Sequence, residues 1–216
     1  MLRSGWTKFV VFMACLTPFL VLAWRFYRAT VVGELTLGAN PVETLTHFTG
    51  NWTIRLIAAT LAITPLRKLL KMPDLIRYRR MIGLYAFFYA ALHFTIYLYF
   101  DKQFDFAAMV RDVGKRPFIT AGVAAFLFML PLAITSTSGW IRRLGGKRWQ
   151  QLHRLVYLSG IAAVVHYYWL VKSDVRLPLM YGAIIGVLLL YRVATKIRMQ
   201  PAQMRPARGA VAAPRT

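Results

Sequence analysis

Six stretches of apolar residues, each close to the length that crosses a lipid bilayer, lie within a chain of only 216 residues. A helix needs about 20 mostly apolar residues to span the hydrocarbon core, and it satisfies its own backbone hydrogen bonds there. The sequence therefore predicts an all-α membrane protein, a bundle of six transmembrane helices. The stretches occupy residues 9–24, 52–66, 81–100, 118–135, 152–171 and 177–191, and the second helix is expected to begin before residue 52.

The charged residues indicate how these helices are oriented. Lys and Arg number 28 against 7 Asp and Glu, a net charge of +21 that would suggest nucleic-acid binding in a soluble domain. With 58% hydrophobic residues, the charge is better explained by short loops between membrane helices, so no nucleic-acid partner is expected. Nineteen basic residues lie in the termini and in the second and fourth loops, whereas six of the seven acids lie in the other loops. The positive-inside rule then places both termini in the cytoplasm.

Composition divides the chain near its C-terminal end. Residues 1–196 hold all six apolar stretches and are expected to form one transmembrane domain. Residues 197–216 are rich in Pro, Ala and Arg, which predicts a disordered, basic cytoplasmic tail. The first stretch has a basic start like that of a signal peptide, but the WRFYRAT that follows lacks a small-residue cleavage pattern, so a retained helix is expected.

Two histidines are expected at the same depth in the membrane. His93 lies seven residues before Phe100 and His166 lies six residues before Lys172, so each is about 9 or 10 Å inside the outer end of its helix. Ionisable residues inside membrane helices mark functional sites by default, and two facing neutral imidazoles are what a six-coordinate heme iron requires. No Cys, Asp or Glu lies at this depth to complete a zinc site, and the single cysteine, Cys15, excludes covalent CxxCH attachment. The alternatives are a hydrogen-bonded pair and a proton relay.

A third histidine is expected near the cytoplasmic face. His153 lies 13 residues before His166, about 20 Å deeper along the same helix. It could ligate a second heme, but the corresponding position on the third helix is Arg79, and a permanently charged guanidinium is a poor iron ligand. The pair Arg79 and Arg80 is suited to an anionic group such as a heme propionate, a flavin phosphate or a lipid phosphate, or simply to anchoring at the membrane surface.

The fourth histidine, His47, lies in the predicted first outer loop, within NPVETLTHFTGNW. Asn40 and Pro41 are typical of a turn, and Glu43 is expected in the first turn of the second helix. A surface histidine is the default expectation here. Glu43 and His47 are four residues apart and so could share one helix face, which leaves a quinol site or a partner-docking surface as the alternative.

Across about residues 5–195 the chain resembles the MsrQ (also called YedZ) family, heme-binding membrane subunits of bacterial periplasmic methionine-sulfoxide reductase systems. That family is similar to the ferric reductase-like transmembrane domains. The resemblance rests on six segments in the same order: NPVETLTHFTGNW, ITPLRKLL, RRMIGLYAFFYAALHF, KRPFITAG, PLAITSTSGWIRRLGGKRWQQLHRLVYLSG and HYYWLVKSD.

The resemblance implies a multi-pass protein of the bacterial inner membrane with non-covalent heme b, one or two per chain, and FMN as a second cofactor. It implies electrons drawn from the quinone pool or from a cytosolic flavin reductase, and passed to MsrP, the periplasmic molybdenum-containing subunit that reduces methionine sulfoxide. By the same resemblance, His93 and His166 match the outer heme ligands and His153 the inner histidine of the fifth helix. Oxidase relatives carry another inner histidine where this chain has Arg79.

These features predict an electron-transfer subunit with no catalytic residues of its own, because two axial imidazoles block access of substrate to the iron. Three alternatives remain: a heme reductase with another acceptor such as a ferric chelate, a heme-free transporter or proton channel, and a scaffold that anchors a partner. Transporters typically have helices broken by Gly or Pro at the midplane. Here Pro18, Pro65 and Pro131 lie near the ends of spans or lack paired half-helices.

Overall fold

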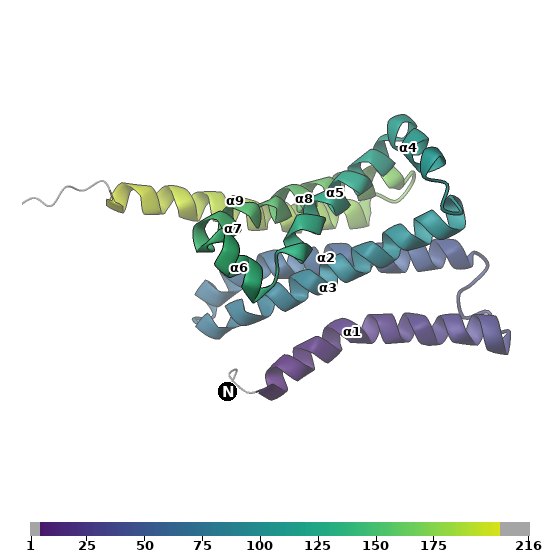
Figure 1. The fold of residues 1–216 in the computed structure, drawn as a ribbon, viewed down its shortest axis with the longest axis horizontal. Helices are drawn as coiled ribbons and strands as arrows, with labels where there is room; N and C mark the ends of the chain where they lie inside the picture. The colour runs from purple at the N-terminus through teal and green to yellow at the C-terminus, as the bar shows by residue number, and fades with distance from the viewer. Residues whose placement is uncertain (1–4, 204–216) are drawn as a thin grey trace, which may run out of the picture.

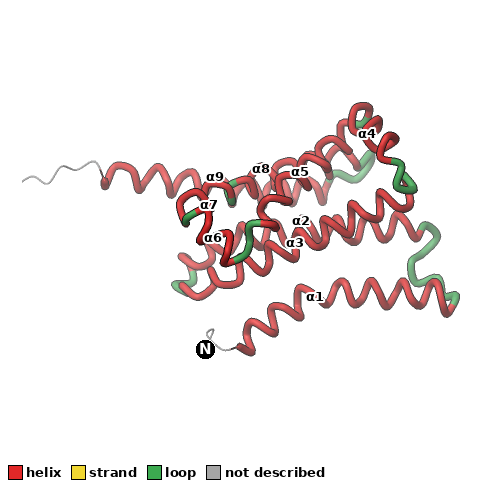
Figure 2. The backbone as a smooth tube through the Cα atoms, viewed as in Figure 1, coloured by secondary structure: helices red, strands yellow, loops and turns green. Residues whose placement is uncertain are grey.

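The computed structural model describes residues 5–203, which are helical with no β-strand among them (Figures 1 and 2). Four of the long helices are α1 (Gly5–Tyr27), α2 (Pro41–Leu69), α3 (Ile76–Ile96) and α5 (Pro117–Ile134), and the other two are α8 (Leu155–Leu170) and α9 (Arg176–Gln203). π-helical turns at Arg28–Val32 and Tyr97–Asp101 extend α1 and α3. Shorter elements lie in the connections: a 3-10 turn (Pro73–Leu75), α4 (Phe106–Lys115), α6 (Ser138–Leu144) and α7 (Gly146–Leu152).

The long helices form a bundle in which neighbours along the chain alternate in direction. α2 packs along α3, α5 packs along α8, and α9 lies against both α2 and α8. In Figure 1 the N-terminus, the connection between α2 and α3, the short helices α6 and α7 and the far end of α9 lie toward the left. α4 and the connections from α1 to α2 and from α8 to α9 lie toward the right.

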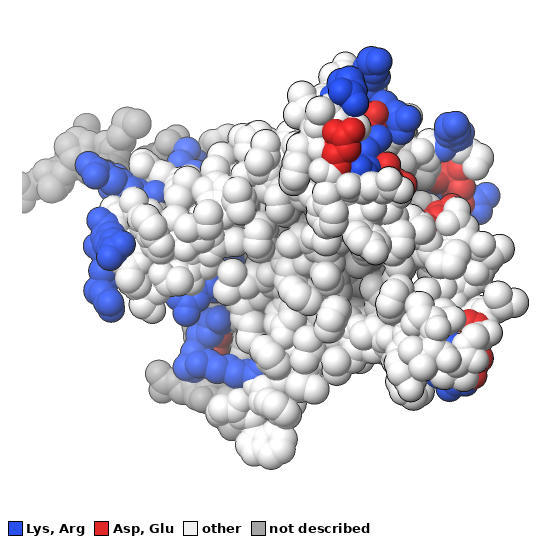
Figure 3. All heavy atoms as spheres, turned by 45° about the vertical axis from the view of Figure 1, so that its right-hand side comes forward, with Lys and Arg blue, Asp and Glu red and all other residues white. Residues whose placement is uncertain are grey.

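The two ends of the bundle differ in charge. At the end that holds the α2–α3 connection, Lys and Arg gather with one acid among the described residues, Asp74, and we call this the basic end. At the other, mixed-charge end, acids and bases lie together, and Figure 3 shows a largely uncharged surface between the two ends. Leu127 of α5 and Val187 and Leu190 of α9 are each more than half exposed. Apolar exposure on this scale is rare in soluble proteins and is what a bilayer covers, so this is a multi-pass membrane protein.

Each of the six predicted apolar stretches forms one of the long helices, which confirms the all-helical class. Four of the helical segments are long and apolar enough to cross a membrane: Gly5–Val32, Pro73–Asp101, Pro117–Ile134 and Arg176–Ile197. The boundary predicted between domain and tail, at residues 196 and 197, falls inside α9, which continues to Gln203. The rest of the predicted tail, residues 204–216, lies outside the described residues.

α2 begins at Pro41, and Glu43 lies in its first turn as predicted, so the loop position given to His47 was wrong and this residue lies on the helix. The side chain of Asn40 caps this helix by accepting a hydrogen bond from the Glu43 amide at 3.2 Å. The polar start of α2 is stable inside a helix because its threonine hydroxyls bond to carbonyls one turn back, which hydropathy alone does not register. These bonds run from Thr46 to Val42 (2.7 Å), from Thr49 to Leu45 (2.8 Å) and from Thr53 to Thr49 (2.9 Å).

α1 is joined to the bundle through a break in its own hydrogen bonding. Pro18 lies inside α1 and distorts the turn around it, and the helix bends near its middle (Figure 2). The hydroxyl of Tyr89 on α3 inserts there, accepting from the Phe19 amide at 2.9 Å and donating to the Cys15 carbonyl at 2.8 Å. Tyr89 is fully buried, so one side chain satisfies both backbone groups and ties α1 to α3.

Candidate functional site

The structure brings His93 and His166 together in one cavity. The cavity has a volume of about 350 Å³ and is enclosed by α2, α3, α5 and α8, near the mixed-charge end. The two imidazole ring centroids are 6.0 Å apart, and the ring planes are at 82° to each other. The residue count along each helix predicted that the two histidines lie at the same depth. The structure adds that their rings face each other across the cavity.

The hydrogen bonds of each imidazole leave one ring nitrogen free. Nδ1 of His93 lies 3.0 Å from the Thr46 carbonyl oxygen, and Nδ1 of His166 lies 2.6 Å from the Phe118 carbonyl oxygen. A carbonyl oxygen only accepts, so each Nδ1 carries the hydrogen and donates it. The lone pair of each neutral ring is then on Nε2. Histidines that bind metals are held in this way, with one nitrogen donating to a fixed acceptor and the other free for the metal.

Two glycines on the facing helices make room for the rings. A Cβ atom added at Gly122 on α5 would lie 2.7 Å from Nδ1 of His166, closer than real contacts allow. A Cβ added at Gly50 on α2 would lie 3.1 Å from Cε1 of His93, which is tight. Neither glycine was identified from the sequence. The signal that could have found them is their position within a helical pattern, where a glycine commonly permits close packing.

The residues of the cavity fit a heme. Two metal–nitrogen bonds of about 2 Å each and two imidazole ring radii of about 1 Å each add to about 6 Å, and the observed centroid separation is 6.0 Å. Nowhere among residues 5–203 do three or more His, Cys, Asp or Glu side chains gather as a metal site, which disfavours a zinc centre. The walls are apolar, with Arg116 among the polar residues, which suits a macrocycle that carries carboxylates. Apolar members of the wall include Ile54, Ile57, Phe94, Phe126 and Met129.

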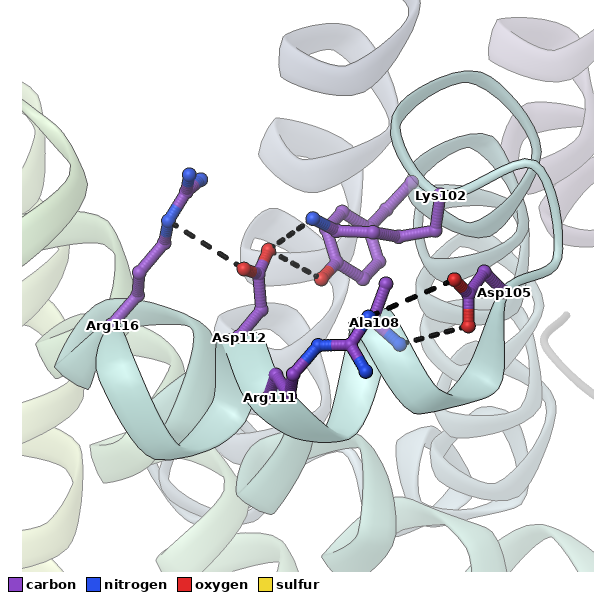
Figure 4. A network of polar contacts seen from close by, with 7 residues as sticks. Lys102, Asp105, Ala108, Arg111, Asp112 and Arg116 are labelled. Atoms are coloured by element: carbon purple, nitrogen blue, oxygen red, sulfur yellow. Dashed lines mark hydrogen bonds and ion pairs between the residues drawn. The ribbon is translucent and has the colours of Figure 1, made fainter.

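A polar network ties the short helix α4 to the end of α3 and the start of α5 (Figure 4). Asp112 on α4 forms an ion pair with Lys102, accepts a hydrogen bond from the Tyr97 hydroxyl at 3.2 Å, and lies 3.8 Å from the Arg116 guanidinium. Tyr97, Asp101 and Arg116 also line the cavity, so the network links α4 directly to the site. The Lys102 ammonium, which bonds to the carboxylate, holds the pKa of Asp112 below its ordinary value.

We predict that Asp112→Asn releases α4 from its contacts with Lys102 and Tyr97. The variant leaves the Lys102 charge, whose side chain is only 13% exposed, without its partner. Hydrogen exchange of the amides of residues 106–115, corrected for intrinsic rates, is expected to be at least about tenfold faster than in the wild type. Arg111→Gln is the control, because Arg111 is exposed and lies 3.8 Å from Asp105 on the outer side of the network.

The same network predicts a pH dependence. The pKa of Asp112 is depressed in the folded protein, so its contribution is fully present above the unfolded-state value of about 4 and is lost as pH falls through the lower folded-state pKa. The protection of the α4 amides from hydrogen exchange in the wild type should therefore be constant between about pH 5 and about pH 8, and it should fall below about pH 4. Equal protection in the wild type and in Asp112→Asn at neutral pH would contradict this role.

At the basic end the structure gathers a second polar cluster, centred on Tyr157. Arg192 on α9 donates to the Tyr157 hydroxyl at 2.8 Å and to the Leu61 carbonyl at 2.7 Å, and its Nε is buried without a hydrogen-bond partner among the described residues. Arg79 is half-buried and also interacts with the Tyr157 hydroxyl and with the charge of Arg192. Arg80 is exposed, so the companion of Arg79 inside the bundle is Arg192, which sequence reasoning did not single out.

His153 lies at the junction of α7 and α8, away from the cavity. Its ring stacks on Trp149 with 3.8 Å between ring centroids, and its Nε2 lies 3.2 Å from the Thr135 hydroxyl. Burial, with the positive charge of Arg79, lowers the pKa of His153 to about 4, so the imidazole is neutral at pH 7. The other three histidines of the chain line the cavity toward the mixed-charge end, and the charge that acts on His153 is that of Arg79.

Comparison with known proteins places these residues in a family context. Residues 49–164 match the family described as "Ferric reductase like transmembrane component". A protein of Herminiimonas arsenicoxydans, named "Protein-methionine-sulfoxide reductase heme-binding subunit MsrQ", is 53% identical over 86% of this chain and 84% of its own length. Proteins of the same name from Xanthomonas axonopodis pv. citri (strain 306) and Xanthomonas campestris pv. campestris (strain 8004) are each 46% identical, over 96% of this chain and 95% of their own length.

Proposed function

The chain belongs to the MsrQ family, within the ferric reductase-like transmembrane proteins, and on this premise we propose that it is the heme-binding electron-transfer subunit of a protein-methionine-sulfoxide reductase. The observation that carries the proposal is the pair His93 and His166, which face each other at 6.0 Å with both Nδ1 atoms engaged by backbone carbonyls. This pair is proposed to hold the iron of one heme b through its two Nε2 atoms.

The chain's residues favour electron transfer over oxygen chemistry. When bound, the heme supplies a one-electron Fe(III)/Fe(II) couple. His93 and His166 would together hold the iron and leave no position open to another ligand, and the apolar walls of the cavity would limit the access of water. Arg116 at the cavity is proposed to hold a propionate, since its Asp112 contact is long at 3.8 Å and its guanidinium is more than half exposed.

The direction of transfer follows from the topology we propose, with six spans, both termini in the cytoplasm and the basic end facing inward. The mixed-charge end, where the histidines lie, then faces the periplasm of an inner-membrane protein. The acceptor is proposed to be MsrP, the periplasmic molybdenum-containing subunit, which repairs oxidised proteins. The donor is proposed to be a quinol from the membrane pool, with a cytosolic flavin reductase as the other source.

The basic end is proposed to hold the anionic part of a second cofactor, FMN. Arg79 and Arg192 place two guanidiniums around one tyrosine with no ion pair to an acid among the described residues. Like charges held together in this way favour an anion between them, and a phosphate accepts from guanidinium groups in a planar, bidentate manner. His153, neutral and stacked on Trp149, lies beside this cluster and is the candidate ligand of a second heme.

Heme stoichiometry tests the proposal. A reduced-minus-oxidised absorption spectrum of the purified full-length protein is expected to show a low-spin b-type heme, and pyridine hemochrome analysis is expected to give one heme per chain. Two hemes per chain would assign the second to His153. No heme in a folded preparation supplied with heme would contradict the proposal and favour a transporter or scaffold. Unchanged methionine-sulfoxide reduction in cells that lack the chain would indicate that the protein passes its electrons to another acceptor, such as a ferric chelate.

A further inference from the structure

An arginine lies near the middle of α2, between two residues that are buried in the bundle, Ile54 and Leu56. Arg55 is five residues beyond Gly50, the residue that contacts the His93 ring, and so is about 8 Å further from the mixed-charge end. Its side chain is exposed. A charged group at this depth is costly and in known membrane proteins marks a ligand, ion or proton site. The heme site described above does not use it.

Arg55 has donors that the chain does not satisfy. Its Nε donates to the Tyr181 hydroxyl on α9 at 3.0 Å, and its guanidinium carbon lies 5.0 Å from the centre of the Trp52 ring. Within residues 5–203, Arg55 forms no ion pair, and its two terminal nitrogens donate no hydrogen bond. Tyr181 accepts from Arg55 and therefore still has its own O–H to donate. Several donors thus converge on one point between α2 and α9, where Tyr181 is buried in the bundle and Arg55 is exposed.

This point is close to the heme cavity. Thr53 and Ile54, the residues next to Arg55 in the sequence, line that cavity, and so does Tyr167 of α8. Tyr167 lies within electrostatic reach of both Arg55 and Tyr181. Arg55 therefore has residues of the cavity wall on either side of it, Ile54 next to it on α2 and Tyr167 on α8.

We propose that Arg55, Tyr181 and Trp52 form the binding site for the ring of a quinol, which enters from the bilayer. The ligand must dissolve in hydrocarbon, because the site opens to the acyl chains, and it must carry an acceptor oxygen. One ring oxygen has two lone pairs and can accept from both the Arg55 guanidinium and the Tyr181 hydroxyl. A lipid phosphate stays at the headgroup level, and a soluble flavoprotein cannot reach this depth.

The site deepens the proposed function, on which it rests, by stating where the donor binds. Oxidation of one quinol to a quinone releases two electrons and two protons. The two electrons would leave one at a time to the single heme held by His93 and His166, which the proposed acceptor would reoxidise between the two transfers, and the two protons would be released to bulk water. Arg55 is permanently protonated and takes up neither of them, so its role is to bind and orient the ring.

The test is the rate of heme reduction by a short-chain quinol, decylubiquinol, in the full-length, heme-loaded protein in nanodiscs. Arg55→Gln and Tyr181→Phe are each expected to slow this reduction at least tenfold at low quinol concentration. Dithionite, which needs no binding site, is expected to reduce both variants as fast as the wild type, with the same spectrum. The matched control is Arg25→Gln, an exposed arginine on α1 that should leave the quinol rate unchanged.

Separate outcomes distinguish failure of the site from failure of the proposed function. Wild-type quinol rates in both variants would overturn the site. Reduction of the wild-type heme by dithionite but not by the quinol would also overturn it, while leaving heme binding intact. If Arg55→Gln does not retain heme, Tyr181→Phe decides, because it keeps the ring and removes only the hydroxyl: slowed reduction supports the site and full-rate reduction refutes it. Absence of heme from the wild type would instead contradict the proposed function.

Discussion

His166→Ala and His93→Ala are each expected to abolish the low-spin b-type spectrum of the purified protein. Each substitution removes one of the two Nε2 lone pairs of the facing rings, which the third histidine of the cavity lining, His47 on α2, is not expected to replace. Because loss of an outer hydrogen bond to a metal ligand already lowers affinity by about 10- to 100-fold, loss of the ligand itself should lower heme affinity by more than about 100-fold. Absorption spectra and heme content per chain measure the effect.

Two controls keep this prediction specific. His153→Ala removes a histidine at the opposite end of the bundle, so it should leave the spectrum of the His93–His166 site unchanged. Free imidazole should restore a low-spin spectrum to His166→Ala, since the substitution leaves ring-sized space beside Gly122. A low-spin spectrum that survives in both cavity variants, or that disappears only in His153→Ala, would refute the assignment of the ligands.

Gly122→Ala is expected to weaken heme binding although residue 122 contributes no ligand. The added methyl group would lie 2.7 Å from Nδ1 of His166, so the ring must move and its 2.6 Å hydrogen bond to the Phe118 carbonyl must change. Overpacking of this kind costs about 1–3 kcal/mol. Expressed as affinity, that is a loss of about 5- to 150-fold. Heme titration measures the loss, and the spectrum reports any displacement of the imidazole.

Two other glycines of the long helices should show a smaller loss of heme affinity and no loss, respectively. Gly50→Ala should act in the same direction but less strongly, because its added Cβ would lie 3.1 Å from the His93 ring. Gly186→Ala has no heavy atom within 4 Å of its added Cβ and serves as the matched control for a glycine in a long helix. If all three variants bind heme equally well, the glycines do not position the histidines.

The sequence predicted most of the helices, and the reason for the exceptions is local. A continuous apolar run is a strong signal for a membrane helix, so α3, α5 and α8 were placed within a few residues of their observed bounds. The apolar run of α2 began only at residue 52, because the threonines before it are polar by composition although each hydroxyl is satisfied by its own helix, and the early start was indicated by the turn at Asn40 and by Glu43. The amphipathic helix α4 was missed because it is short and lies in a loop by hydropathy.

The candidate site was predicted only in part. Depth along a helix is a product of residue count and rise, so the sequence could place His93 and His166 at one level. Which ring nitrogen is free depends on two distant backbone carbonyl groups. That of Thr46 lies 47 positions before His93, and that of Phe118 lies 48 positions before His166. The pairing of Arg79 with Arg192 and of Arg55 with Tyr181 likewise depends on which helix faces are in contact.

The sequence by itself determined the properties that can be read along the chain. These are the lengths of the apolar stretches, the charge asymmetry between the loops and the depth of each histidine along its helix. These follow from properties of single helices in a bilayer, which need no knowledge of neighbours. Only the tertiary structure decided the rest, that two rings face each other at 6.0 Å, that glycines at positions 50 and 122 accommodate them, and that an intramembrane arginine meets a tyrosine. The physical reason is that rotation of a helix about its axis is set by side-chain packing against its neighbours, and no single helix carries that information.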